Sequence, residues 1–551
     1  MTPGWSHEVD VLVVGSGAGG MTAALTGALE GLETLLVEKA PVYGGTTALS
    51  GGGIWVPNNP AVTKAGVTDP PQRVIEYLEH ITEGRIPRSR LAAYVEHGPA
   101  MFEMFGARTR HLEFSWCPGY ADYHPEAPGG RPEGRSVECP PFDLDLLGDL
   151  AETLRGSSMK VPGGLVITSA DYVKLNMLTR TWLGRRTAFR LGVQGALDRL
   201  RRRRMVSLGQ SLVARLRASL VDAGVPVWLD SPLLDLVRDE KGTVVGAVVR
   251  HDGDAVRVRA RKGVVIASGG FDHNETMRKE HLPEVGRDDV SGGAESNTGD
   301  GITAGQAVGA AVDLMDDAWW MPSIRRPDGK VHALVAERSI PNSLIVTPQG
   351  ERFANEASPY VTFVHAQIEG GHPYLWFVMD QTARRRYPFG AVIPGKDFPE
   401  TWYEAGLAHR ADTIAGLAEA IGVPAGTLEA TVARYNAMVP TGRDDDFGRG
   451  ESAYDRYYGD PTLPNPVLGT VAEGPYLAVR IEAGDLGTKG GLLTDEHARV
   501  LDASGATIQG LYATGNAAAS VMGNDYAGAG ATIGPAMVFG YVAARHAAGE
   551  R

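Results

Sequence analysis

Three glycines and one acidic residue near the N-terminus have the types and the spacing of a nucleotide-binding site. Gly15, Gly17 and Gly20 follow an apolar run, and Glu38 ends a second apolar run further along. In such a turn, one glycine permits the tight bend, one lets the backbone approach a pyrophosphate and one brings the helix close to the strand. The helix N-terminus offers N–H groups to phosphate, and the acid accepts from ribose hydroxyls. This stretch predicts dinucleotide binding.

The residues after Glu38 narrow the choice of nucleotide. KAPVYGGTTALS spans 39–50 and leads into three more glycines at 51–53. A cluster of backbone N–H groups and hydroxyls so soon after the acid resembles the flavoprotein version of this fold, so we expect non-covalent FAD rather than NAD. The contacts predicted in this part of the chain are Gly15, Gly17, Ala18, Gly20, Glu38, Lys39, Gly44, Gly45, Thr46, Thr47, Ser50, Gly51 and Gly52.

Strand, glycine-rich turn, helix and strand indicate an α/β, Rossmann-like FAD-binding domain. The apolar run GVVIASGG at 263–270 is predicted to return to the same sheet and bring Gly269 to the cofactor. The C-terminal segment supplies another strand, GLYATGN at 510–516, and then a glycine-rich loop that leads into a final helix. Its predicted cofactor contacts, to the ribityl chain and the pyrimidine carbonyls of the flavin, are Gly515, Asn516, Thr532 and Ile533.

The two ends of the chain are therefore predicted to build one domain, which the middle of the chain caps. We expect the FAD-binding domain to comprise residues 1–274 and 480–551, with a basic insert at about 175–204. Residues 275–479 have a mixed α+β pattern and form the inserted catalytic domain. The length of 551 residues exceeds one ordinary domain, and 43% hydrophobic residues suffice for sizeable cores.

Composition argues against several classes of function. A formal net charge of −13 argues against nucleic acid as a partner. Cys117 and Cys139 are the only cysteines, and their spacing matches neither a zinc site nor a redox CxxC pair. We therefore expect no metal site and a reducing compartment. The first residues show no signal region and no apolar run approaches the roughly 20 residues that span a bilayer, so we expect a cytoplasmic protein.

One segment departs from this acidic composition. Nine arginines lie between Arg180 and Arg204 against a single acid, Asp198, and large apolar residues are interleaved with them. A basic, amphipathic segment of this kind, Leu175–Arg204, is typical of peripheral contact with an anionic membrane, here the inner face of the cell membrane. A solvated charged helix or an oligomer contact explains the same pattern, and the sequence leaves these alternatives open.

Over nearly its whole length the chain resembles the 3-ketosteroid 1-dehydrogenases, within the larger group of fumarate reductase-like flavoproteins. The resemblance implies removal of two hydrogens, from carbons 1 and 2 of the A ring of a 3-ketosteroid substrate. The motifs that carry it are VLVVGSGAGG (11–20), VEKAPVYGGTTALSGGGIWVPNN (37–59), CPGYADYHPEAPGGRPEGRS (117–136), NTGDGITAG (297–305), MDDAWW (315–320), GERFANEASPY (350–360), RGESAYDRYYGDP (449–461), DLGTKGGLLTD (485–495) and GLYATGNAAASVMGNDYAGAGATIGPAM (510–537).

The resemblance also implies four catalytic residues. The Tyr526 hydroxyl and the Gly530 N–H would hold the 3-keto oxygen. Tyr360, helped by Tyr123, would take the proton from carbon 2, while carbon 1 gives a hydride to the flavin. Tyr120 is an alternative helper. Some relatives have prolines where this chain has alanines at 527 and 529, so we expect a less rigid loop here.

Elementary chemistry agrees with these roles. A hydrogen next to a ketone becomes acidic only if the developing enolate is stabilised, and each preorganised donor is worth about 3–4 kcal/mol. A tyrosine base has an ordinary pKa of about 10 and needs help near neutral pH. The alternatives are dehydrogenation at carbons 4 and 5, a fumarate-type dicarboxylate reductase, and a non-catalytic flavin-binding or membrane-docked protein. Because we find no second nucleotide fingerprint, we expect an external electron acceptor such as a quinone.

Overall fold

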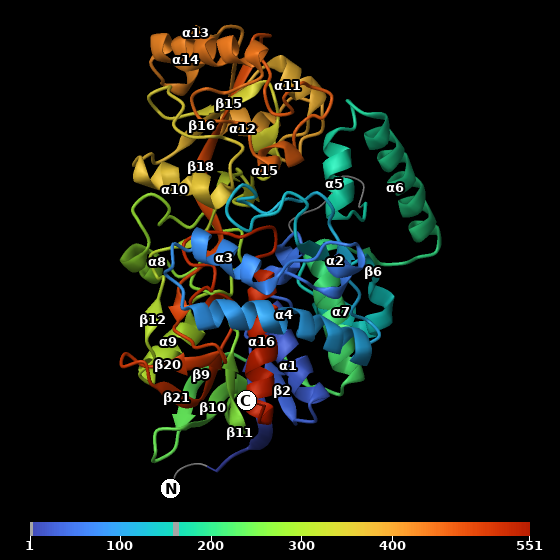
Figure 1. Cartoon of the computed structure of the whole chain (residues 1–551), viewed down its shortest axis with the longest axis vertical. Coiled ribbons are helices and arrows are strands. Elements are labelled where there is room, and N and C mark those ends of the chain that lie inside the picture. Colours follow the sequence, from blue (N-terminus) through green and yellow to red (C-terminus); the bar gives the residue numbers. More distant parts are fainter. Residues whose placement is uncertain (1–3, 158–164, 551) are drawn as a thin grey trace.

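The computed structural model describes residues 4–157 and 165–550, which form two parts built on separate sheets (Figure 1). In the first sheet, β1 (His7–Val14) lies between β2 (Thr34–Val37) and β11 (Asp254–Ile266) and is parallel to both. β21 (Thr507–Ala513) pairs with β11, also in parallel. Strands from both ends of the chain thus share one sheet, as the sequence predicts.

The edges of this sheet carry shorter, partly antiparallel strands. The alternating patterns around 233–259 form a meander, in which β9 (Leu233–Arg238) pairs with β10 (Val244–His251) and β10 pairs with β11. β11 is long enough to continue from this meander into the apolar run at 263–266. β8 (Val227–Trp228) extends the sheet beyond β2, and β20 (Arg499–Leu501) extends it beyond β21.

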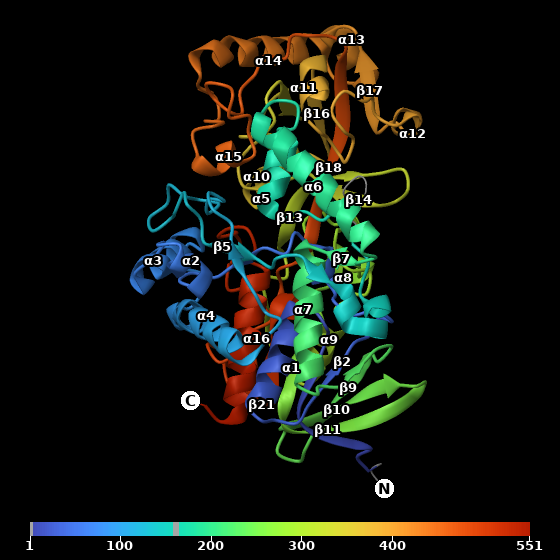
Figure 2. The same cartoon turned by 90° about the vertical axis from the view of Figure 1, so that its right-hand side faces the viewer.

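Three helices pack together on this domain (Figure 2). They are α1 (Ala18–Leu29), α7 (Leu208–Asp222) and α16 (Ile533–Ala548). α1 and α16 approach closely because glycines face each other: a Cβ added to Gly540 would lie 2.4 Å from the Gly19 carbonyl oxygen. The N-terminal helix is therefore joined to the C-terminal helix by backbone-to-backbone packing that larger residues exclude.

The second part contains a six-stranded antiparallel sheet. Its central strand, β18 (Tyr476–Thr488), pairs with β13 (Ala318–Arg325), β16 (Leu375–Met379) and β17 (Ala408–Ala411). The predicted domain limit at 479/480 falls inside β18, so this strand lies on both sides of it; the division into domains stays a prediction. The remaining strands are β14 (Val331–Ala333) and β15 (Ser343–Val346), and α13 (Ile414–Ile421) and α14 (Ala425–Met438) pack together in this domain.

The other elements cover or connect these two parts. α5 (Ser169–Asn176) and α6 (Trp182–Leu200) form a hairpin at the side of the molecule (Figure 1). Within residues 4–157 and 165–550, no helix is long and apolar enough to cross a membrane. The remaining helices are α2 (Pro60–Lys64), α3 (Pro71–Ile81), α4 (Arg88–Arg108), α8 (Glu275–His281), α9 (Asp300–Ala307), α10 (Tyr360–Glu369), α11 (Gln381–Arg386), α12 (Glu400–Glu404) and α15 (Ala453–Tyr457).

Short strands and turns complete the description. They are β3 (Ile54–Trp55), β4 (Ser115–Trp116), β5 (Ser136–Glu138), β6 (Phe142–Asp143), β7 (Met205–Val206), β12 (Val312–Asp313) and β19 (Gly491–Leu492), with 3-10 turns η1 (Thr46–Leu49), η2 (Leu144–Thr153), η4 (Glu337–Ser339), η5 (Val439–Thr441) and η6 (Gly515–Ala517). The two cysteines, one just after β4 and one just after β5, are buried and free. β3 and β5 bring the loop at 115–142 against the first domain.

Candidate active site

The turn between β1 and α1 contains glycines of two kinds. Gly15 has a φ of +107°, and a Cβ there would lie 2.2 Å from the Ala267 carbonyl oxygen. At Gly20 a Cβ would lie 1.9 Å from the Gly15 carbonyl oxygen. A Cβ at Gly17 instead meets its nearest neighbour, Thr47 Oγ1, only at 3.7 Å. Backbone packing within the protein therefore requires glycine at positions 15 and 20, whereas the position of Gly17 has room for a ligand beside the backbone.

Glu38 follows directly after β2, with its carboxylate held beside this turn. One oxygen accepts from the Ser16 N–H at 3.0 Å and from the Ser16 hydroxyl, and the other accepts from the Ala40 N–H at 2.9 Å. Glu38 is buried. The acid is thus fixed at the carboxyl end of the strand, where the sequence predicts that it meets a ribose.

The loop after Glu38 wraps around the same turn. Thr47 Oγ1 accepts from the Ala18 N–H, the first residue of α1, at 3.0 Å, and the Gly44 N–H donates to Ser16 Oγ at 2.9 Å. Close to this loop, Cβ atoms added to Gly45 and Gly51 would meet nothing nearer than 3.5 Å and 4 Å. Gly17, Gly45 and Gly51 therefore have room beside their backbones, whereas Gly44 and Gly52 are packed against other residues.

The segment NTGDG at 297–301, for which we predicted no cofactor contact, lies beside the same loop. Lys39 Nζ donates to Asp300 Oδ2 at 2.7 Å and to Thr298 Oγ1 at 2.5 Å. The Asn297 side-chain amide donates to Thr46 Oγ1 at 2.9 Å. These contacts were missed because they join residues about 250 positions apart; the motif itself was the only available signal.

The C-terminal residues join the cofactor region to a second group of side chains. Asn516 lies in η6, and its Oδ1 accepts from Trp319 Nε1 at 3.0 Å. Thr532 is the N-cap of α16, which begins at Ile533. A Cβ at Gly515 would meet nothing nearer than 3.6 Å, whereas one at Gly269 would lie 2.6 Å from Asn297 Oδ1. Gly269 is thus packed against the NTGDG segment.

Three predicted catalytic tyrosines meet, although they come from distant segments. The ring centroids of Tyr123 and Tyr360 are 5.2 Å apart, those of Tyr123 and Tyr526 5.1 Å, and those of Tyr360 and Tyr526 5.5 Å. The Tyr123 hydroxyl donates to the Tyr360 hydroxyl at 3.0 Å. At least 95% of the surface of each residue is buried. This group of three is called the tyrosine cluster below.

The hydroxyl of Tyr526 is oriented by Thr532, the N-cap residue of α16. Thr532 Oγ1 donates to it at 3.0 Å, so the oxygen is oriented while its own proton can be donated to a further acceptor. The Tyr526 ring packs edge-to-face on Trp319, with centroids 4.9 Å apart. Trp319 therefore contacts both Tyr526 and Asn516, and it links the tyrosine cluster to the predicted cofactor residues.

Tyr123, rather than Tyr120, is the hydroxyl that meets Tyr360. The Tyr120 hydroxyl accepts from the Tyr458 hydroxyl at 2.7 Å, and its ring stacks on Tyr457 at 4.4 Å. A residue that sequence reasoning missed, Tyr454, packs on Tyr123 at 4.6 Å. Its motif is one of those that carry the resemblance, but the spacing of its aromatic residues gives no indication of which one points inward.

Burial dominates the electrostatics of the cluster. Removal from water raises the pKa of Tyr123 and of Tyr360 well above 10. It also raises the pKa of Tyr526, although hydrogen bonds from Thr532 and Tyr360 act in the opposite direction. The three phenols are therefore protonated near neutral pH. Tyr360 is the first residue of α10, where the helix dipole favours negative charge.

Gly530 packs closely against the backbone of Gly53. Its φ is +93°, and a Cβ there would lie 2.3 Å from the Gly53 carbonyl carbon and oxygen. The two alanines of this loop are fixed through their carbonyls: Ala527 O accepts from the Tyr123 N–H at 3.1 Å, and Ala529 O accepts from Ser136 Oγ at 2.7 Å. The lower rigidity expected without prolines stays a prediction.

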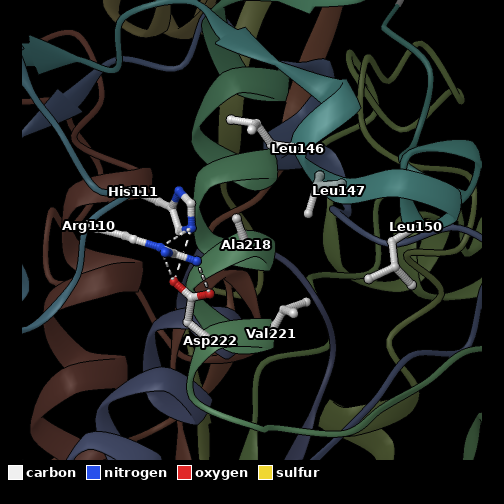
Figure 3. A pocket seen from close by; sticks show the side chains of 8 residues that line it. All are labelled: Arg110, His111, Leu146, Leu147, Leu150, Ala218, Val221 and Asp222. Atoms are coloured by element: carbon white, nitrogen blue, oxygen red, sulfur yellow. Dashed lines mark hydrogen bonds and ion pairs between the residues drawn. The ribbon is translucent and has the colours of Figure 1, made fainter.

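A hollow on the surface, shown in Figure 3, contains none of the predicted site residues. Asp222 accepts there from Arg110 and lies 3.1 Å from His111 Nε2, beside apolar side chains of η2 and α7. The hollow in Figure 3 is therefore not formed by the predicted catalytic or cofactor-binding residues.

Comparison with known proteins agrees with this geometry. The FAD binding domain family matches residues 10–533. A 3-oxosteroid 1-dehydrogenase of Mycobacterium tuberculosis is 46% identical over 99% of both chains, and one of Mycolicibacterium smegmatis is 45% identical over 98% of this chain and 97% of its own. The chain belongs to the 3-oxosteroid 1-dehydrogenase family. A solved family structure, the 3-ketosteroid delta1-dehydrogenase from Sterolibacterium denitrificans in complex with 1,4-androstadiene-3,17-dione, is 39% identical with a TM-score of 0.94, covering 99% of this chain and all of that one.

FAD is the cofactor of this 3-oxosteroid 1-dehydrogenase family member, and the described residues fit it. Gly17, Gly45 and Gly51 leave open the space that Cβ atoms would fill, at the N-terminus of a helix whose dipole favours phosphate. The Glu38 carboxylate is fixed beside the same turn by its bonds from Ser16 and Ala40. These residues would hold the nucleotide, with Asn516 and Thr532 on the side of the tyrosine cluster; which of the predicted contacts form remains a proposal.

Proposed function

We propose that the protein removes two hydrogens from carbons 1 and 2 of the A ring of a 3-ketosteroid and leaves a double bond between them. The observation that carries this proposal is the tyrosine cluster: three buried phenols from three segments, linked through Trp319 to Asn516 of the cofactor-binding region. The names of the close relatives support the same substrate and the same bond.

Two donors would hold the 3-keto oxygen of the substrate. The Tyr526 hydroxyl is oriented by Thr532 and keeps a proton to donate. The Gly530 N–H would be the second donor, on a backbone that contact with Gly53 holds in place. Both are set before the substrate arrives, so negative charge that develops on the oxygen is stabilised without reorganisation. This makes the hydrogen on carbon 2 acidic.

Tyr360 would accept that proton as the general base. The Tyr123 hydroxyl donates to Tyr360, so it would stabilise the phenolate, as would the N-terminus of α10. Burial raises the pKa of Tyr360, so the active phenolate is a small fraction near neutral pH, and this fraction grows as the pH rises. When bound, FAD supplies the acceptor for the hydride that leaves carbon 1. The two broken C–H bonds thus yield one proton, one hydride and the new double bond.

The surroundings favour a flat apolar substrate. Tyr454 and Trp319 pack directly on the cluster, and such faces suit a hydrocarbon ring system better than a dicarboxylate. The test is anaerobic mixing of the FAD-loaded protein with a 3-ketosteroid whose A ring is saturated. Bleaching of the flavin and a product double bond at carbons 1 and 2 are expected. A double bond at carbons 4 and 5 would favour the sister activity, and no bleaching would exclude both.

We also propose that an external acceptor, such as a quinone, reoxidises the flavin. The sequence contains one nucleotide fingerprint, at 11–20, and this one is assigned to FAD. Reduced enzyme, prepared anaerobically with steroid, should regain its oxidised spectrum on addition of a water-soluble quinone but not of NAD or NADP. Reoxidation by a nicotinamide cofactor alone would refute this proposal.

Finally, we propose that α6 contacts the surface of an anionic membrane. Trp182, Phe189 and Leu200 are 77%, 74% and 80% exposed. Together with Val193 they recur at intervals of seven and four residues, which places them on one face of a helix. The buried face of α6 holds Gly184, Thr187 and a single large apolar residue, Leu191. An exposed face that is more apolar than the buried one requires a partner.

The arginines indicate which partner this is. Several are neutralised within the protein: Arg180 pairs with Asp460 at 2.6 Å, and Arg204 pairs with Asp145 at 2.8 Å. Arg186 lies near the apolar stripe by helical spacing, so it would meet lipid phosphates when the stripe enters the interface. Such a combination of an apolar stripe and neighbouring cations suits an anionic lipid surface better than a second acidic chain.

Vesicle sedimentation tests this contact. Changing Trp182, Phe189 and Leu200 to Ser should reduce binding to vesicles with anionic lipid by more than tenfold, since each buried side chain contributes about 1.5–3 kcal/mol. Leu146→Ser, at a residue 67% exposed on η2, is the matched control and should bind like wild type. Unchanged vesicle binding by the triple variant, or a dimer in solution that the variant abolishes, would overturn the proposal.

A further inference from the structure

An ion pair joins the two segments that carry Tyr123 and Tyr526. His124 directly follows Tyr123, and Asp525 directly precedes Tyr526. His124 Nε2 lies 2.9 Å from Asp525 Oδ1, and the same oxygen accepts from the Tyr526 N–H at 2.7 Å. Asp525 Oδ1 therefore contacts both His124, which follows Tyr123, and the backbone N–H of Tyr526.

Neutral hydrogen bonds connect the same two segments. Ala527 O accepts from the Tyr123 N–H at 3.1 Å and from the Tyr77 hydroxyl at 2.7 Å. The His124 N–H donates in turn to the Tyr77 hydroxyl at 3.3 Å. The ion pair is thus the ionisable member of a small network that surrounds the tyrosine cluster. Neither His124 nor Asp525 has a role in the chemistry described above.

We propose that the His124–Asp525 ion pair is a positioning clamp that sets the distance between the Tyr123–Tyr360 base and the Tyr526 hydroxyl. This inference rests on the proposed function, because both tyrosines must act on one ring of the substrate at once. Loss of the pair leaves the hydrogen bonds to Ala527 O in place but releases the Asp525 carboxylate, so the Tyr526 hydroxyl can shift relative to Tyr123. A misplacement of about 1 Å at reacting groups slows catalysis by about a hundredfold, so even a smaller shift has a measurable effect.

The charges around the pair favour its ionised form. Burial lowers the pKa of His124, but Asp525 outweighs burial, with Glu126 and Asp122 adding to it, so the pKa lies above its ordinary value of 6.5. Burial raises the pKa of Asp525, yet His124 and the more distant Lys489 hold it below 3.8. The phenol of Tyr77 also faces this region.

The sign of the pH effect follows from these directions. A histidine with a raised pKa stops stabilising the ion pair as the pH rises through that pKa. An aspartate with a lowered pKa stops stabilising it as the pH falls through its own pKa. The clamp is therefore intact across neutral pH and opens on the alkaline side. The tyrosine base becomes more active in that same direction, so only a comparison with a variant separates the two effects.

The experiment compares His124→Gln with wild type over a range of pH. Glutamine can keep a neutral hydrogen bond but not the charge. We expect flavin reduction by a saturated 3-ketosteroid to be about tenfold slower at neutral pH, with steroid binding little changed. The wild-type to variant ratio should fall towards one as the pH rises through the pKa of His124. A ratio that stays constant with pH would overturn the clamp.

Two further measurements keep the outcome specific. His111→Gln removes a histidine that pairs with Asp222 at 3.1 Å on the surface, and it should leave the rate unchanged (Figure 3). Asp525→Asn combined with His124→Gln should be no slower than the slower single variant, since both remove one pair. Additive losses would overturn the clamp. Failure of wild type to bleach would instead refute the proposed function, and the clamp with it; bleaching by wild type and His124→Gln at equal rates refutes the clamp alone.

Discussion

Replacement of Tyr526 by Phe isolates the proposed oxyanion donor, because it removes one oxygen and keeps the ring. The ring contacts that hold this residue, at 4.9 Å to Trp319 and 5.1 Å to Tyr123, do not involve the hydroxyl. The substitution therefore leaves the packing of the cluster intact. Its direct cost to the fold is the loss of the hydrogen bonds that Thr532 and Tyr360 make with this hydroxyl, about 1 kcal/mol of stability each.

The cost to catalysis should be much larger. Loss of one preorganised donor to a developing oxyanion costs about 2.7–4 kcal/mol, a factor of about 10² to 10³ in rate. The substrate is held mainly by apolar contact, so its dissociation constant should change far less. Thr532→Val is the matched control: it removes the hydroxyl that orients Tyr526 but leaves the donor itself, and we expect a loss of about tenfold or less.

The assay is the rate of flavin reduction after rapid anaerobic mixing with a 3-ketosteroid, measured over a range of steroid concentrations. This separates the limiting rate from the dissociation constant. Unfolding in denaturant, followed for the same variants, removes any contribution from lost stability. A limiting rate within threefold of wild type for Tyr526→Phe would refute the reasoning, since no oxyanion donor is then contributed by this residue.

Three further predictions follow from other parts of the structure. Gly17→Val should leave a folded protein that no longer retains FAD, measured by flavin absorbance after gel filtration, whereas Gly15→Ala should unfold because its Cβ would lie 2.2 Å from a carbonyl oxygen. The limiting rate of flavin reduction should rise with pH in wild type, because the Tyr360 phenol, whose pKa burial raises, loses its proton only on the alkaline side, and this rise should disappear in Tyr360→Phe. The pKa of Asp317 is lowered to about 2, because Lys489 at 2.9 Å and His365 outweigh the effect of burial. The Asp317 carboxylate should therefore contribute about 2 kcal/mol to the free energy of unfolding, and this contribution is lost as the pH falls from about 4 to 2. Asp317→Asn leaves Lys489 unpaired and should cost about 3–5 kcal/mol at neutral pH, measured by denaturant unfolding.

The parts of this site that the sequence predicts are local in the chain. Gly15, Gly17 and Glu38 lie within one strand–turn–helix–strand unit, so their spacing alone fixes their arrangement. The tyrosine cluster is different: Tyr123 and Tyr360 are separated by 237 positions, and no periodicity relates them. Only resemblance to a family identifies these residues, and only the three-dimensional structure shows that their hydroxyls meet.

The contacts that sequence reasoning missed are also long-range. The pairs Lys39–Asp300 and Trp319–Asn516 join residues about 200 or more positions apart, within motifs that gave no indication of a partner. Likewise, β18 (476–488) runs across the predicted domain limit at 479/480, and no turn residue in the sequence marks that limit. The arginine-rich segment was recognised from composition, but composition could not show which of its arginines pair with acids inside the protein, as Arg180 does.

The most direct test of the central claim is to locate the hydrogens that are lost. A 3-ketosteroid saturated in its A ring and carrying deuterium at carbons 1 and 2 is incubated anaerobically with the FAD-loaded protein. We predict a product that has lost one hydrogen isotope from each of these carbons, with the new double bond between them and one flavin reduced per steroid. A product unsaturated at carbons 4 and 5, or a flavin that stays oxidised, would contradict the account.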